Sequence, residues 1–373
     1  MKSINYQNLC QYNIDDWSNV MSFISELNFE KTHLHITPHV SPFRFNKNIK
    51  YCVVSTGFEE VPDFENIERW CNINQECYFL ILGDFKLNSY RFPSNATFIE
   101  YRFFYLELCQ LLSISPEIIP IKDKKIKYKF SSLSFKEREL RAIITAQLLT
   151  FAKNQSLISY HNEFNFSENL NEGIEKHNNI HREMIMNARN SEEFSRLDWS
   201  FLSKSLKIDN FDRSKNDILK NIFNISIPAY KESLINFSNE TFHLGVYLDD
   251  DGNDFIRPSP YISEKTWKPL LSGCILVNIA QPKMYEFLKE NYHIPIEYSI
   301  DMSYDNELFE YERMQKIQEL IIKLSDTPID VILEQNIESC QKIQNTLLNR
   351  DYIKQFEVFN ESQDKVILDI INS

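Results

Sequence analysis

Short apolar runs separated by polar, turn-forming segments dominate the first part of the chain. Three of these runs predict strands: Lys50–Thr56 (KYCVVST), Cys77–Asp84 (CYFLILGD) and Ala96–Phe104 (ATFIEYRFF). Helix-like stretches such as NIERWCNI and YLELCQLL lie between and around them. Apolar strands that alternate with helices are typical of a parallel sheet covered on both faces. We therefore expect any chemistry in the loops that follow the carboxyl ends of these strands.

The second part of the chain repeats this pattern after a candidate linker, Ser115–Phe130, which carries two prolines and a basic run. Residues 162–224 are polar and helical in tendency. Around them the apolar periodicity predicts further strands and helices. The strands are IKYKFSSL, SLISY, the start of Glu232–Phe242 and GCILVNI, and the helices are Lys136–Lys153, PKMYEFLKEN with Pro282 at its start, and ERMQKIQELIIKLSD.

The length of 373 residues exceeds what one compact core usually holds, so it predicts two domains. We expect an α/β fold with an α/β domain over residues 1–120 and a second over residues 121–355. The amphipathic segment 356–373 is expected to form a helix that packs back toward the first domain. A cleft between two such domains is a common place for a small-molecule site.

Composition and charge narrow the function classes. The formal charge of −13 disfavours nonspecific nucleic-acid binding, which needs a surplus of Lys and Arg. The seven cysteines include no CxxC pair, which favours free thiols in a reducing cytoplasm. No signal peptide and no apolar run near ~18 residues is visible, so we expect a soluble, cytoplasmic protein without a transmembrane segment. Peripheral membrane contact stays open, but no basic amphipathic helix supports it.

Several familiar motifs do not occur. The chain has no GxGxxG after a strand, no GxxxxGK[ST] loop and no GxSxG elbow. His33, His35 and His39 could present metal ligands on a strand, but no partner stands at ligand spacing, which favours polar loop or edge positions. The acidic run Asp249–Asp254 lacks the glutamate that closes a calcium loop and predicts a solvated turn. We expect no metal site.

The segment Tyr261–Asn278 (YISEKTWKPLLSGCILVN) places a charged pair, Glu264 and Lys265, just ahead of a buried strand. A helix N-terminus after a strand presents N–H groups and a positive dipole end to an anion. A lysine there adds a full charge for a phosphate, and a carboxylate can accept both hydroxyls of a ribose. The same pair also suits a plain solvated helix end, and the local pattern alone favours that interpretation.

The start of this helix has two alternatives. Either Ser263 or Thr266 can be the N-cap, and Gly273 is expected just after the last turn. With Ser263 as the cap, Pro269 falls one turn inside the helix and removes a backbone hydrogen bond. With Thr266 as the cap, Pro269 falls in the first turn, where proline is tolerated. The sequence does not choose between them.

The Tyr-x-x-Glu-Lys spacing resembles the donor-binding segment of the α1,3-fucosyltransferase family. It is also similar to the TEKTWKP segment of related bacterial and phage-borne glycosyltransferase-like proteins. The resemblance implies that Lys265 contacts the diphosphate of a nucleotide sugar. It further implies that Tyr261 and Glu264 hold the nucleoside, with Ser263 in the same donor-binding segment.

Two further stretches carry the resemblance. Tyr128–Leu148 is similar to the family's strand, loop and helix with an arginine for the diphosphate, which implies Arg141 first and Arg138 second. Here Leu140 precedes Arg141 where the family has His, and Ser134 stands where Asn is usual. The strand-like NFSNET resembles the strand that precedes the donor segment, which places Glu240 near the nucleotide. The resemblance spans roughly residues 124–324, and the long insertion between residues 159 and 230 leaves the donor sugar open, with a GDP-sugar slightly favoured.

The resemblance implies a GT-B glycosyltransferase, in which two Rossmann-like domains flank a cleft and the C-terminal one binds the donor. Such enzymes usually need no metal, and the inverting ones use a carboxylate of the N-terminal domain to deprotonate the acceptor. The candidates for that base are Asp84, Glu60, Glu100 and Glu59, with His39 as an outside choice, and Asp84 has the best strand-end context. The expected acceptor is a glycan or glycolipid, such as a surface polysaccharide or lipopolysaccharide.

Two other classes of protein stay open. One is a nucleotide-binding protein with a degenerate transferase fold and no catalysis. The other is a phage-type transferase that glycosylates modified DNA, which the acidic charge disfavours.

Overall fold

The computed structural model of the chain divides into two compact units, residues 1–113 with 349–373, and residues 114–348. The boundaries predicted from the sequence are residues 120 and 355. The structure describes the backbone of three strands in the first unit together with residues 108, 111, 112, 349–356, 358, 359 and 362. In the second unit it describes residues 118–134, 138–160, 172–203, 206, 225, 227–240, 246–248, 254–256 and 262–348.

The described part of the first unit holds a parallel sheet of three strands, β1 (Val53–Thr56), β2 (Cys77–Leu82) and β3 (Ala96–Tyr101), in the order β1-β2-β3. All three lie within the apolar runs that predicted them. The parallel pairing confirms the expected sheet type. The predicted helical segment around residues 66–73 lies outside the described residues.

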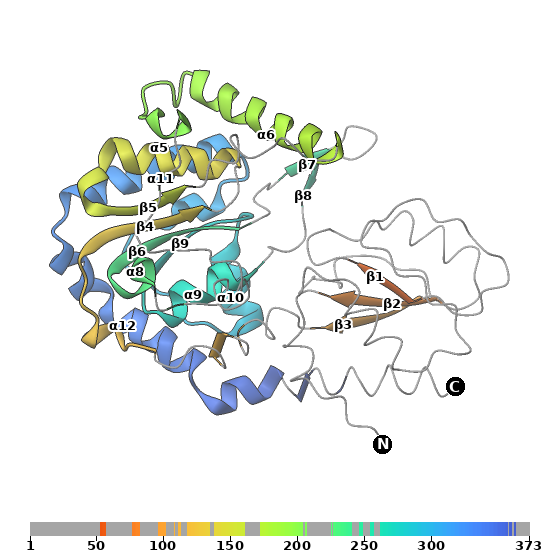
Figure 1. The fold of residues 1–373 in the computed structure, drawn as a ribbon. Helices are drawn as coiled ribbons and strands as arrows, with labels where there is room; N and C mark the ends of the chain where they lie inside the picture. The colour runs from red at the N-terminus through yellow and green to blue at the C-terminus, as the bar shows by residue number, and fades with distance from the viewer. Residues whose placement is uncertain are drawn as a thin grey trace. The chain divides into compact units, whose positions relative to one another are not determined.

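The second unit is built on a four-stranded parallel sheet (Figure 1). Its order is β5-β4-β6-β9, so the first strand along the chain lies between the second and the third. The α/β fold is therefore shown, and this sheet is compatible with a Rossmann-like domain. The four strands are β4 (Tyr128–Ser134), β5 (Ser156–Tyr160), β6 (Ser233–Asn239) and β9 (Ile275–Ile279).

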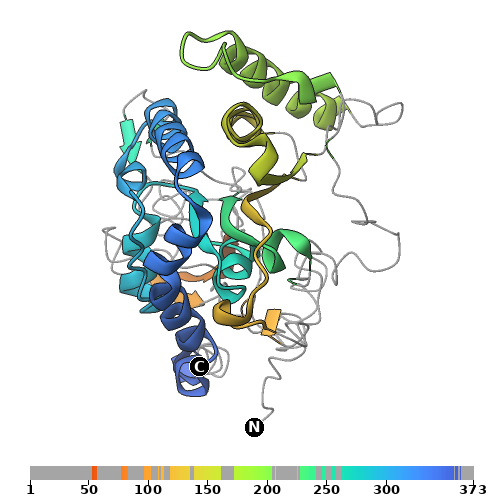
Figure 2. The ribbon, with the colours of Figure 1, turned by 90° about the vertical axis from the view of Figure 1, so that its left-hand side faces the viewer.

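Helices cover both faces of this sheet (Figures 1 and 2). Parallel crossovers are right-handed, so helices lie on opposite faces when the chain winds outward in opposite directions from the sheet centre. Here the chain winds one way from β4 to β5 and the other way from β6 to β9. One face is covered by α5 (Glu139–Phe151) and α11 (Glu310–Asp326), and α6 (Glu172–Asn190) packs on α5. The other face is covered by α8 (Pro228–Lys231), α9 (Glu264–Leu271) and α12 (Ile329–Leu347).

Strand β6, inside the sheet, and strand β9, at one end of the described sheet, are buried at every position. This explains why GCILVNI reads as a nearly continuous apolar run rather than an alternating one, because a strand covered on both faces has no solvent side. Phe130 and Phe237 meet in the core with ring centroids 5.9 Å apart. Helix α5, which begins at residue 139 rather than 136, buries nine consecutive residues after its first.

Contacts with distant residues hold the C-terminal end of α9 in place. Gly273 follows the helix with φ of 65°, in the left-handed region, as the sequence predicted. At the same end the Lys124 ammonium donates to the carbonyl of Ser272 (3.1 Å), and the Gln344 amide of α12 donates to the carbonyl of Leu271 (2.8 Å). A cation and an amide thus take up carbonyls that a helix leaves without partners at its C-terminus.

The long helix α12, the short helix α8 and the antiparallel hairpin of β7 (Val246–Leu248) and β8 (Asp254–Ile256) are among the elements that the sequence did not predict. The predicted acidic turn falls between these strands, and residues 249–253 lie outside the described residues. Helix α10 (Met284–Tyr292) begins two residues after Pro282.

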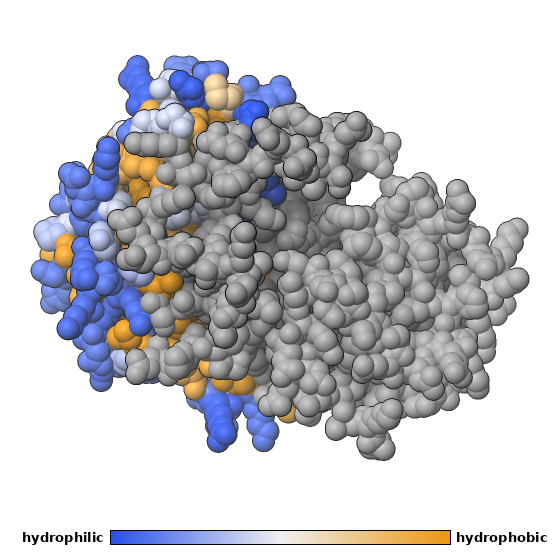
Figure 3. All heavy atoms as spheres, in the orientation of Figure 1, coloured by the Kyte–Doolittle hydropathy of each residue, from blue (hydrophilic) through white to orange (hydrophobic). Residues whose placement is uncertain are grey.

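Polar side chains cover most of the outer edge of the second unit in the view of Figure 3. Among the described helices, none is long and apolar enough to cross a membrane. Cys274 and Cys340 are buried free thiols, as expected for these two positions.

Candidate functional site

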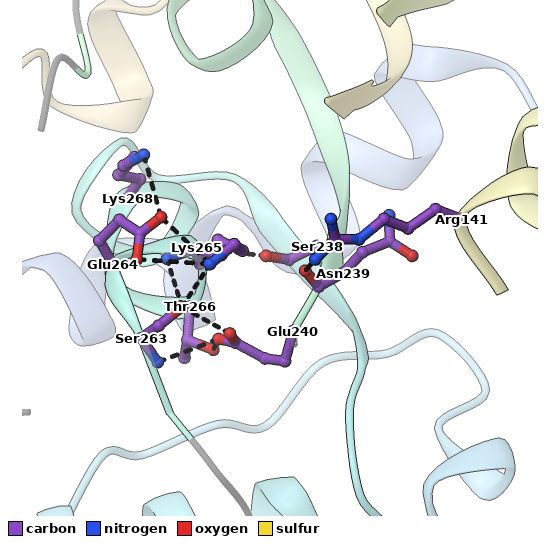
Figure 4. Close-up of polar contacts among 9 residues, drawn as sticks. All are labelled: Arg141, Ser238, Asn239, Glu240, Ser263, Glu264, Lys265, Thr266 and Lys268. Carbon is purple, nitrogen blue, oxygen red and sulfur yellow. Dashed lines mark hydrogen bonds and ion pairs between the residues drawn. The ribbon is translucent and has the colours of Figure 1, made fainter. Parts of the chain in front are cut away.

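The candidate site lies at the carboxyl ends of β4 and β6. Because β5 lies on one side of β4 and β6 on the other, the crossover direction reverses between these two strands. In open α/β sheets, ligands bind in the crevice at such a reversal. Helices α5 and α9 both begin at this edge, and Figure 4 shows Arg141 of α5 and the first residues of α9 on opposite sides of the end of β6.

Glu240, the first residue after β6, holds the start of α9. Its carboxylate accepts the backbone N–H of Ser263 (3.1 Å), the Ser263 hydroxyl (2.5 Å) and the Thr266 hydroxyl (2.5 Å). The Ser263 hydroxyl oxygen in turn accepts the N–H of Lys265 (3.3 Å), so Ser263 is the N-cap and Thr266 is not. Burial raises the pKa of Glu240, although Lys265 and the two hydroxyls oppose that shift.

Glu264 and Lys265 form an ion pair at the first turn of α9. The Lys265 ammonium lies 3.2 Å from Oε1 of Glu264, and the Lys268 ammonium lies 3.8 Å from the same oxygen. Burial alone raises the pKa of Glu264, but the two lysines outweigh it and hold the pKa at about 2. The Lys265 side chain is 29% exposed and Lys268 only 7% exposed, so Lys265 is the more accessible of the two lysines.

Pro269 lies inside α9, and the structure shows how the helix accommodates it. Proline has no N–H, so the carbonyl of Lys265, four residues earlier, receives no helical hydrogen bond from position 269. The hydroxyl of Ser238, the penultimate residue of β6, donates to that carbonyl instead (2.5 Å). Because of the proline, the Lys265 carbonyl is available to Ser238, and this hydrogen bond ties the backbone of Lys265 to the end of β6.

We expect Ser238→Ala to lower the free energy of unfolding by about 1–2 kcal/mol, because it leaves the Lys265 carbonyl unpaired in a partly buried place. In a Pro269→Ala background the alanine N–H can reach that carbonyl, so the same change should cost less than about 0.5 kcal/mol. Chemical denaturation of the two single variants and the double variant measures the coupling. An equal cost in both backgrounds would show that Ser238 does not replace the missing helical bond.

Arg141 brings a buried cation to the same edge from α5. Its side chain is almost fully buried, and Nη2 donates to the main-chain oxygen of Asn239 at 3.4 Å. Burial, and then the neighbouring Arg138, lower the pKa of Arg141 to about 10, while Glu240 and Glu264 act in the opposite direction. The guanidinium therefore stays charged at neutral pH.

The N-terminus of α5 differs from that of α9. Arg138 is the N-cap residue, and no described side chain caps the helix there. Glu139 is turned to α11, where its Oε1 accepts the hydroxyl of Tyr311 (2.7 Å). Burial raises the pKa of Glu139. The positive end of α5 thus lies beside Arg141, whereas the first N–H groups of α9 are taken by Ser263 and Glu240.

The structure brings six of the expected site residues together at this edge: Arg138, Arg141, Glu240, Ser263, Glu264 and Lys265. Of the other expected residues, Tyr261, Asp84 and Glu60 lie outside the described residues. The backbone of Glu100 is described, in β3 opposite Ile81 of β2.

Sequence reasoning missed two polar residues of this edge, Ser238 and Asn239. The signal that was available is the pair Ser238-Asn239 at the end of a predicted buried strand, next to Glu240. In the described ranges no group of three or more His, Cys, Asp or Glu side chains is placed to hold a metal ion.

The geometry defines a protein of the α/β class with a polar site at the reversal point of a parallel sheet. No protein-family model matches the chain, and no curated protein or solved structure matches it either.

Proposed function

We propose that the chain is a glycosyltransferase that moves a sugar from a nucleoside-diphosphate donor to a glycan acceptor. The observation that carries this proposal is the approach of two cations, Arg141 and Lys265, from two helix N-termini at the reversal point of the sheet. A diphosphate presents charge to both at once. During sugar transfer, negative charge develops on the leaving diphosphate, and fixed cations can stabilise that charge without a metal.

The carboxylates in the site have a supporting role in this proposal. Glu240 accepts hydrogen bonds from Ser263 and Thr266, and Glu264 forms ion pairs with Lys265 and Lys268. They fix the start of α9 and hold Lys265 charged and in place. Since an ionised carboxylate can accept about four hydrogen bonds, Glu264 also retains capacity for a nucleoside hydroxyl.

The remaining parts of the proposal concern the first unit. We assign the acceptor side of a GT-B arrangement to it and an inverting, metal-independent reaction to the whole chain. A carboxylate at the end of one of its strands then takes the acceptor proton, with Asp84 as the first choice and Glu60 and Glu100 as the alternatives. Asp84→Asn with unaltered turnover would exclude that residue.

A thermal-shift panel of GDP, UDP, dTDP, CMP and ADP tests the donor site. A ligand that binds only the folded chain raises the melting temperature. At a ligand concentration 100 times the dissociation constant, the folded chain is stabilised by about 2.7 kcal/mol. We expect one diphosphate to give the largest shift and CMP, which has a single phosphate, to give little. A panel without any shift contradicts the proposed donor site.

A transfer assay with the sugar ester of the best nucleotide then separates an enzyme from a binding protein. Release of free nucleoside diphosphate, by transfer or by hydrolysis, supports the transferase. Tight nucleotide binding without such release identifies the non-catalytic alternative.

A further inference from the structure

The side chain of Asn239 is buried at the site, and within the described part of the chain it makes no hydrogen bond. It is 3% exposed, and neither its amide nitrogen nor its amide oxygen finds a partner among the residues that the structure describes. Ser134, at the end of β4, is a second such residue. It is 1% exposed, and its hydroxyl has no hydrogen-bond partner among the described residues. Buried polar groups are rarely left without partners in folded proteins, so these two require an explanation.

The strand register places these two groups side by side. In the parallel pair of β4 and β6, Ser132 lies opposite Phe237, so two residues further along each strand Ser134 lies beside Asn239. Side chains two apart share a face, and this face is the one on which the rings of Phe130 and Phe237 meet beneath α5. Both groups therefore point to the α5 side of the sheet edge.

This side is also where Arg141 lies. Its guanidinium donates to the main-chain oxygen of Asn239, so the cation and the unpartnered amide are neighbours. The adjacent residue Ser238 points to the opposite face, where it binds the backbone of Lys265. The end of β6 thus contributes a structural hydroxyl to one face and an unused amide to the other.

The chemistry of the amide restricts what it can bind. A phosphate only accepts hydrogen bonds, so it satisfies the amide nitrogen of Asn239 and leaves the amide oxygen unpaired. A sugar hydroxyl both donates and accepts, as does the hydroxyl of Ser134. A hydroxyl-bearing group next to a phosphate therefore fits the amide, the serine and Arg141 together.

We propose that Asn239 and Ser134 recognise the hydroxyls of the sugar attached to the diphosphate, and so select the donor. This inference rests on the proposed function and deepens it: the cations bind the diphosphate, and the two neutral groups read the sugar. Sites built to hydrogen-bond a substrate hydroxyl discriminate strongly against analogues that lack it, because their own polar groups are then left unpaired.

Calorimetric titration of matched pairs tests this assignment. The probes are GDP with GDP-fucose, UDP with UDP-glucose, and dTDP with dTDP-glucose. For the pair that the wild-type chain binds, we expect Asn239→Leu to weaken the sugar ester about 10- to 100-fold and the bare diphosphate less than about 3-fold. Ser134→Ala should shift the same ratio in the same direction. Lys265→Ala should weaken both members of the pair equally.

Asn236 provides the matched control on the same strand. It is also a buried asparagine of β6, but its amide donates to the hydroxyl of Ser131 (2.8 Å) on the other face. We expect Asn236→Ala to lower the melting temperature and leave the ratio of the two affinities unchanged. Asn239→Leu should melt at or above the wild-type temperature, because an apolar side chain of similar shape replaces an amide without partners.

The outcomes separate this inference from the function on which it rests. If the wild-type chain binds none of the six probes, both fail. If it binds but Asn239→Leu and Ser134→Ala weaken both members of a pair alike, or neither, only the sugar-reading role is overturned. A leucine variant that unfolds shows that the fold itself needs the amide, and this also overturns the assignment.

Discussion

Lys265→Ala is expected to reduce sugar transfer by about 10³-fold and to leave the chain folded. The Lys265 ammonium is the more exposed of the two that contact Glu264, and the Ser238 contact ties its backbone to the end of β6. Removing one fixed group that stabilises developing charge typically costs about 10²–10³ in rate. Steady-state transfer rates with the donor found by the nucleotide panel measure the effect, and a melting curve shows that the variant is folded.

Lys268→Ala is the control for this prediction. Lys268 lies one turn further along α9, is nearly buried, and contacts the same carboxylate of Glu264 at 3.8 Å. In Figure 4 it lies beside Glu264, farther from Arg141 than Lys265 does, so its loss should affect stability more than transfer. Arg141→Ala should remove transfer as Lys265→Ala does, with a larger loss of stability because Arg141 is buried. Full activity in the Lys265 or Arg141 variant would remove the donor-site assignment.

Glu240→Ala is expected to lower the free energy of unfolding by about 3 kcal/mol or more. The change leaves three donors without their acceptor: the N–H and hydroxyl of Ser263 and the hydroxyl of Thr266. Each buried donor left unpaired costs about 1–3 kcal/mol. Because these contacts define the start of α9, nucleotide affinity should fall as well. Urea denaturation and a nucleotide titration measure the two effects.

Glu240→Gln distinguishes the hydrogen bonds from the charge. Glutamine keeps an acceptor oxygen and removes the charge, and it is the burial of that charge that raises the pKa of Glu240. We therefore expect Glu240→Gln to keep most of the wild-type stability at neutral pH. By linkage, a carboxyl group whose pKa is raised by folding stabilises the folded state at pH values below its unfolded pKa of about 4.5. This stabilisation is lost as the pH rises through the pKa of the folded state. Wild-type stability relative to Glu240→Gln should then decline with rising pH, and a constant difference would contradict this account.

The strands and most helices were predictable because their signal is local. The run SLISY forms β5 over the same five residues, and the segment around Gly273 ends α9 with the expected left-handed residue. Helix α12 was missed because several of its buried positions are polar. Gln344 is buried to bind Ile121 and Leu271, and Asn336 to bind Ser299, so the apolar period that marks a helix is interrupted.

The candidate site was predictable only in part. The charged pair ahead of a buried strand, and an arginine at the start of the helix that follows β4, are visible along the chain. The choice of Ser263 over Thr266 as the cap was not, because it depends on Glu240, which lies more than twenty residues earlier. Pro269 looked like an obstacle to the helix for the same reason, since the hydroxyl that compensates for it belongs to β6.

The sequence by itself determined the α/β fold class, the positions of the main strands along the chain and the charged residues available for a site. Apolar runs and helical periods are properties of neighbouring residues, and they survive without any knowledge of distant contacts. The tertiary structure decided which of those residues meet. Strand order placed the ends of β4 and β6 at a reversal point, and register turned Ser238 to one face and Asn239 to the other. Contacts between segments a hundred residues apart depend on packing, which no local pattern encodes.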